Sequence, residues 1–143
     1  MTIYADTSFF VSLYLPDRHS EEARRRVAER PRIWLTPLHR AEWGHAVAQH
    51  VFQGKISACE SQRVYTDFEH DRKADLWVEV DLPEMVFETC AALARRHVAR
   101  MGGRTLDSLH VAAAVELKAD HFWTFDMRQA KMAEAEGLKA SWS

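Results

Sequence analysis

The chain has 143 residues, a length typical of one domain, and 47% of them are hydrophobic, enough for a packed core. Its 19 basic and 21 acidic residues give a formal net charge of −2. This balance argues against a pure nucleic-acid-binding module, which needs excess positive charge to bind phosphates, but it does not exclude an enzyme that handles nucleic acid through a metal.

The two cysteines are too few for a disulfide framework. No apolar run approaches the roughly 20 residues that a membrane helix needs, and no targeting segment is visible. We therefore expect a single cytoplasmic domain over residues 1–143, without a membrane partner.

The first third of the chain alternates strands and helices. Residues 3–5 predict a short buried strand that Asp6 ends, and Ser8 can cap the apolar helical run 9–15. Ser20 is a second candidate cap, for a surface helix over 20–30. A strand over 32–35 follows, and Thr36-Pro37 then opens a helix that reaches about Phe52.

The same alternation continues to the end of the chain. We expect a polar helix to about residue 75, a strand over 77–81, a helix from Pro83 to Met101, a helix capped by Thr105, a strand over 121–125, a helix over 127–136 and a last strand over 138–142. Such an order predicts an α/β fold of three layers, α/β/α, with a central, mostly parallel sheet of four to five strands. In a parallel sheet the strand ends line up along one edge.

Four acidic residues fall where this geometry gathers side chains: Asp6, Glu42, Asp107 and Asp126. Asp6 and Asp126 follow strands, whereas the other two lie near the starts of helices. Each has an ordinary alternative explanation as a helix cap, a first-turn acid or a solvated residue. Together they predict an acidic cluster at the edge where open α/β sheets bind ligands.

Clustered carboxylates repel one another unless a counterion or protons intervene. Mg²⁺ and Mn²⁺ prefer such oxygen ligands, and a metal held there can polarise a phosphoryl oxygen and activate a water for in-line attack. The nearby hydroxyls of Thr7, Ser8, Thr105 and Thr124 can support the ligands. Asp6 and Asp107 are the first candidates for direct ligands, followed by Asp126, with Glu42 acting directly or through water.

Three stretches carry a family resemblance: IYADTSFFVSLYL, LTPLHRAEWGHAV, and the run from Arg104 that contains LDSLHVAAA and a strand ending TFD. They resemble PIN-domain ribonucleases, and most closely the VapC-like toxins of type II toxin–antitoxin pairs. The resemblance implies that Asp6, Glu42, Asp107 and Asp126 form the catalytic, metal-binding set. It also implies Mg²⁺ or Mn²⁺ dependence, RNA (tRNA or mRNA) as substrate, a homodimer, and a larger complex with a cognate antitoxin.

Other patterns favour different functions. His39, Glu42 and His45 form H-x-x-E-x-x-H, as in di-iron helical bundles, but the strand signals argue against that fold. A phosphotransfer receiver-like domain would use an Asp nucleophile, and a non-catalytic PIN-fold binding module would keep the fold without the reaction. Arg104 and Arg128 flank the acidic edge and can hold a phosphate or pair with an acid. His110 lies on the same helix face as Asp107 and can touch substrate or fill the edge of the core, and we favour the structural role.

Overall fold

The computed structural model describes residues 1–141 and contains one sheet of five parallel strands, in the order β3-β2-β1-β4-β5. The strands are β1 (Thr2–Ala5), β2 (Arg32–Leu35), β3 (Val78–Glu79), β4 (His121–Trp123) and β5 (Lys139–Ser141). Strand β1 is central, and its Tyr4 lies opposite Trp34 of β2 and Phe122 of β4. The predicted α/β class and parallel sheet are confirmed.

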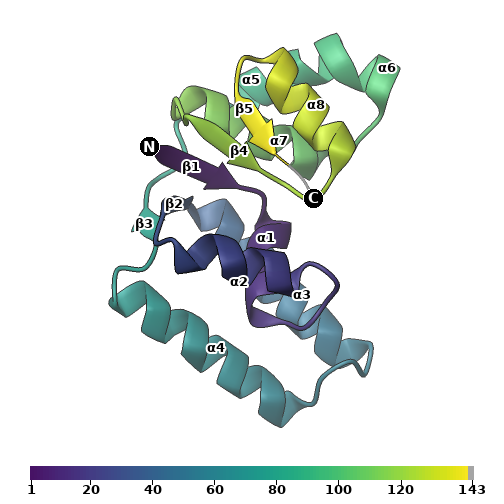
Figure 1. The fold of residues 1–143 in the computed structure, drawn as a ribbon. Helices are drawn as coiled ribbons and strands as arrows, with labels where there is room; N and C mark the ends of the chain where they lie inside the picture. Colours follow the sequence, from purple (N-terminus) through teal and green to yellow (C-terminus); the bar gives the residue numbers. More distant parts are fainter. Residues whose placement is uncertain (142–143) are drawn as a thin grey trace.

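Helices cover both faces of this sheet (Figure 1). One face carries α1 (Thr7–Tyr14), α2 (Ser20–Ala28), α3 (Pro37–Phe52) and α4 (Ala58–Lys73); the other carries α5 (Val86–Leu93), α7 (Thr105–Glu116) and α8 (Met127–Ala135). A π-helix, η1 (Ala94–Val98), and a short α6 (Ala99–Met101) connect α5 to the loop before α7.

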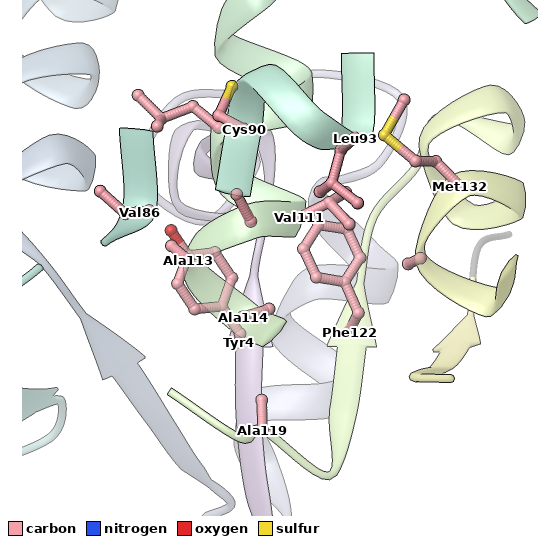
Figure 2. Close-up of a cluster of buried hydrophobic side chains, with 13 residues drawn as sticks. Tyr4, Val86, Cys90, Leu93, Val111, Ala113, Ala114, Ala119, Phe122 and Met132 are labelled. Carbon is pink, nitrogen blue, oxygen red and sulfur yellow. The ribbon is translucent and has the colours of Figure 1, made fainter. Parts of the chain in front are cut away.

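The alternation of side chains along β1 divides the core in two. Ile3 and Ala5 belong to the cluster under α1, α3 and α4, whereas Tyr4 belongs to the cluster under α5, α7 and α8. Figure 2 shows this second cluster, in which Tyr4 and Phe122 lie beneath Leu93 and Val111. Helix α7 is buried continuously from Ser108 to Ala114 because α5 and the sheet enclose it.

Several predicted helix starts are wrong by one to three residues. Helix α1 begins at Thr7 with Asp6 as its cap, so Ser8 lies inside the helix. Ser20 and Thr105 are first helical residues rather than caps, and α5 begins at Val86 after a turn rather than at Pro83. The Thr36 cap with Pro37 in the first turn is confirmed. The last predicted strand is β5, and the Trp142 assigned to it lies outside the described residues.

Two glycines end the segment before α7. Gly102 has φ +70° and Gly103 has φ +130°, conformations that residues with a Cβ rarely adopt. A Cβ on Gly102 would also lie 3.4 Å from Nη1 of Arg128. The turn therefore brings the start of α7 and the start of α8 next to each other at the carboxyl edge of the sheet.

Candidate active site

The four predicted acids come from four different elements that end or begin at the carboxyl edge of the sheet. Asp6 caps α1 directly after β1, and Asp126 caps α8 shortly after β4. Glu42 lies in the second turn of α3, and Asp107 lies in the first turn of α7. Helices that follow parallel strands run back along the sheet, so their first turns lie near this edge.

Asp6 is held by several donors. Its Oδ2 accepts hydrogen bonds from the Ser8 backbone N (3.2 Å) and from Ser8 Oγ (2.6 Å), and its Oδ1 accepts one from Gln129 Nε2 (3.1 Å). Burial raises the pKa of Asp6, but the charge of His110 and the hydrogen bonds from Ser8 and Gln129 outweigh burial and lower it. The carboxyl is therefore ionised at neutral pH, and Asp6 is both a helix cap and a partly buried charge.

Glu42 is oriented by two side chains that meet at one of its oxygens. Thr7 Oγ1 donates to Glu42 Oε1 (2.8 Å), and His110 Nε2 donates to the same oxygen. The other ring nitrogen of His110, Nδ1, lies 2.7 Å from the Tyr4 hydroxyl. A chain of polar contacts thus runs from Tyr4 in the core to the Glu42 carboxylate at the edge.

His110 is the buried histidine of the site. Burial lowers its pKa, but the hydrogen bond to Glu42 and the charges of Asp6, Glu42 and Asp107 raise the pKa above its usual value. Its Nε2 lies 3.9 Å from Asp6 Oδ1. The histidine that the sequence suggested was structural therefore bridges two of the four acids.

Asp107 and Asp126 are tied to backbone groups at the starts of their helices. Asp107 Oδ2 accepts from the Arg104 backbone N (3.2 Å) and from Arg104 Nε (3.3 Å). Asp126 Oδ1 accepts from the backbone N of Arg128 (2.8 Å) and of Gln129 (3.4 Å). The hydrogen bond from Asp107 raises the pKa of Arg104, and the charges of Asp107, Asp6 and Asp126 add to this effect. Each of the four acids therefore raises the pKa of Arg104, of His110 or of both.

The residues fit a hard divalent cation in chemistry, since every candidate ligand is a carboxylate oxygen. Within residues 1–141, however, no three His, Cys, Asp or Glu side chains are arranged closely enough to hold a metal as a group. Mg²⁺ usually takes one or two carboxylates and keeps several waters. The arrangement matches that mode better than a cage of four direct protein ligands.

The H-x-x-E-x-x-H pattern does not form a metal site. His39 is fully buried, its Nδ1 accepts from the Thr36 backbone N (3.0 Å), and its Nε2 donates to the Ala5 carbonyl (2.7 Å). Burial lowers the pKa of His39 to about 3, so the ring is neutral. His39 thus joins the start of α3 to the end of β1, whereas Glu42 lies at the acidic edge of the sheet.

Sequence reasoning missed Gln129, which contacts both Asp6 and Asp107. No motif marks a glutamine in the first turn of a helix as part of a site, and only the fold brings it next to Asp6 and Asp107. The Asp107–His110 spacing of three residues was a visible signal for His110, since it places both side chains on one face of α7.

Comparison with known proteins identifies the family. The PIN-domain family model matches residues 3–135, so the chain belongs to the PIN-domain family. No curated protein sequence matches the chain. This confirms the family indicated by the three sequence stretches.

Solved structures share the fold at low sequence identity. The chain is similar to VapC20 of Mycobacterium tuberculosis, described as a sarcin-ricin loop cleaving toxin (TM-score 0.69, 17% identity, 95% of each chain covered). It is similar to VapBC2 of Rickettsia felis bound to a promoter DNA fragment (0.68, 14%, 99% and 98% covered). It is also similar to a toxin–antitoxin complex of Klebsiella pneumoniae (0.59, 13%, 89% and 88% covered).

Proposed function

We propose that this protein is an endoribonuclease dependent on Mg²⁺ or Mn²⁺ and the toxin of a type II toxin–antitoxin module. The proposal is supported by the position of Asp6, Glu42, Asp107 and Asp126 at or near helix starts along the carboxyl edge of a PIN-domain sheet. His110 contacts Glu42 there, and Arg104 donates to Asp107. Similarity in fold to a toxin that cleaves the sarcin-ricin loop supports the same substrate class, RNA. The proposed substrate is tRNA or mRNA.

The residues take distinct roles in this proposal. Asp6 and Asp107 would hold the cation, followed by Asp126, and Glu42 would act directly or through water. A bound divalent cation would supply polarisation of a phosphoryl oxygen and a lower pKa for water. Thr7 and His110 fix the Glu42 carboxylate, and the exposed Arg104 and Arg128 would pair with phosphates.

The proposal extends to the protein's partners and its place in the cell. Solved relatives include a toxin–antitoxin complex, which supports an antitoxin as a partner of this chain. We propose one PIN domain over residues 1–143, a cytoplasmic homodimer, and a larger assembly with the antitoxin. Within residues 1–141, no helix combines the length and apolarity that crossing a membrane requires.

The test is cleavage of RNA by the purified chain with Mg²⁺, Mn²⁺ or a chelator, followed by sequencing of the new ends. We expect cleavage only with metal, leaving 5′-phosphate and 3′-hydroxyl ends, and none with Asp107→Asn. RNA binding without cleavage under every metal condition would instead favour a non-catalytic binding module, and covalent labelling of one Asp by a phosphoryl donor would favour a receiver.

A further inference from the structure

Gln129 is the buried residue with the widest set of contacts to the candidate site. It is the third residue of α8 and is 3% exposed. Its amide Nε2 donates to Asp6 Oδ1 (3.1 Å) and to the backbone carbonyl of Asp107 (3.1 Å). One side chain therefore joins the loop after β1 to the first turn of α7.

The same amide reaches the third aspartate through Thr124. Gln129 Oε1 accepts from Thr124 Oγ1 (2.6 Å), and Thr124 Oγ1 accepts from the Asp126 backbone N (3.0 Å). The backbone N of Gln129 also donates to Asp126 Oδ1 (3.4 Å). The contacts of Gln129 thus include all three aspartates of the site.

The orientation of this amide follows from its partners. A carboxylate and a backbone carbonyl can only accept, so the NH₂ group must face Asp6 and Asp107, and the oxygen must face the Thr124 hydroxyl. Both N–H groups and the carbonyl are then paired. A fully satisfied buried amide has one favourable arrangement and therefore holds its neighbours in fixed positions.

We propose that Gln129 is a positioning residue that sets the spacing of Asp6, Asp107 and Asp126. Its amide is uncharged, so it joins the Asp6 carboxylate to the Asp107 backbone without cancelling the negative charge that a cation would require. A Lys or Arg in its place would neutralise Asp6, and an apolar residue would leave the Asp6 carboxylate with fewer donors. This inference rests on the proposed function, in which these aspartates hold the metal.

The first experiment compares Gln129→Met, of similar size, with the unmodified protein and with Gln62→Met, an exposed position on α4. Isothermal titration with Mn²⁺ alone is expected to show affinity lower by about tenfold to a hundredfold for Gln129→Met. RNA cleavage should show a lower kcat at unchanged KM, and Gln62→Met should match the unmodified protein. Unchanged Mn²⁺ affinity and kcat in folded Gln129→Met would overturn the proposal.

A second variant provides a test if Gln129→Met does not fold. Thr124→Val keeps the volume of the side chain and removes the hydroxyl that holds Gln129 Oε1. It should lower Mn²⁺ affinity in the same direction and by a smaller factor. If Gln129→Met does not fold, an unchanged Mn²⁺ affinity in folded Thr124→Val overturns the proposal.

The last measurement needs neither metal nor RNA. Urea unfolding with chelator is compared for Gln129→Met, Asp6→Ala and the double variant. Because Gln129 acts on Asp6 directly, the two changes should be less than additive, and additivity would overturn the link. If the unmodified protein neither binds Mn²⁺ nor cleaves RNA, the proposed function fails, and this cycle still decides whether Gln129 holds Asp6.

Discussion

At the scale of single residues, Asp6 combines two roles that the sequence presented as alternatives. It caps α1 through the Ser8 backbone N, and it is also one of the acids around His110. Finding a cap therefore does not count against a role in the site. The cap fixes the position of the carboxylate, since its Oδ2 is bound to Ser8 while its Oδ1 faces Gln129 and His110.

Asp6→Asn separates the two roles. Asparagine caps a helix about as well as aspartate, so the fold should survive, as measured by circular dichroism and urea unfolding. Loss of the charge should weaken metal binding and lower RNA cleavage by at least about a hundredfold. A folded Asp6→Asn protein that cleaves RNA at the unmodified rate would leave the cap as the sole role of Asp6.

The residues also show which parts of the site can be predicted from sequence patterns. Asp6, Glu42, Asp107 and Asp126 could be selected because acids after strands and in first turns of helices lie at one edge of a parallel sheet. Gln129 and Tyr4 could not be selected, because their roles depend on contacts across more than 100 positions in sequence. Neither residue type carries a local signal for such a contact.

At the scale of elements, the order of strands and helices was predictable, whereas several helix starts and the π-helix were not. Ser20 resembles a cap in the sequence, but its Oγ accepts from the Asp17 backbone N in the turn before the helix. Leu93 and His97 are both buried, and the η1 residues that follow Leu93 form a π-helical turn, which is wider than an α-helical turn. Hydrophobic spacing alone does not distinguish that turn from a regular α-helix.

The η1 segment is fastened to α8 by Glu136. His97 Nε2 lies 2.7 Å from Glu136 Oε2, and Arg96 Nη2 donates to Glu136 Oε1 (2.8 Å). Burial raises the pKa of Glu136, but Arg96 and His97 outweigh burial and lower the pKa below 4.5. Since the folded state has the lower pKa, ionised Glu136 stabilises the protein above pH 4.5, and this stabilisation is lost as pH falls through the folded pKa.

Glu136→Gln should therefore lower the free energy of unfolding by about 1 kcal/mol at pH 7. The difference from the unmodified protein should shrink as the pH is lowered below 4.5. Urea unfolding at a series of pH values measures both effects, and Glu134→Gln, at an exposed position in the last turn of α8, is the control. A difference that stays constant with pH would mean that the charge of Glu136 is not the stabilising feature.

At the scale of the whole molecule, the apolar run 9–15 and the stripe from Val86 to Met101 contribute mainly to the core. Phe9, Phe10, Val86 and Leu93 are fully or almost fully buried within the monomer. The large apolar side chains that stay exposed include Phe87 (65%) on α5 and Leu106 (44%) on α7. Phe87 borders a groove of about 340 Å³ between these helices, whose lining includes Ala91, Val98 and Leu109.

We expect a homodimer that buries Phe87 and the groove beside it, since exposed apolar patches commonly mark interfaces. Sedimentation equilibrium at micromolar concentration should show a dimer, and Phe87→Ser should shift it toward monomer. Phe52→Ser, at the end of α3 and 85% exposed, should leave the dimer intact. A monomer for the unmodified chain would remove the prediction, and a dimer insensitive to Phe87→Ser would place the interface elsewhere.

The last prediction concerns the effect of a bound metal on the stability of the whole fold. The acids lie at or near the starts of α1, α3, α7 and α8, on both sides of the sheet, so a cation that binds them acts only on the folded state. A ligand at a hundred times its dissociation constant stabilises the folded state by about 2.7 kcal/mol. Saturating Mg²⁺ or Mn²⁺ should therefore raise the melting temperature, and Asp107→Asn should weaken that rise.

Asp107→Asn has a separate effect that the experiment must subtract. The change removes a charge that pairs with Arg104, whose side chain is 85% exposed, so the stability lost without metal should be small. The melting temperature of each protein is therefore measured with chelator first and compared with its own value in metal. Equal melting temperatures with metal and with chelator for the unmodified protein would mean that the four carboxylates do not share a cation.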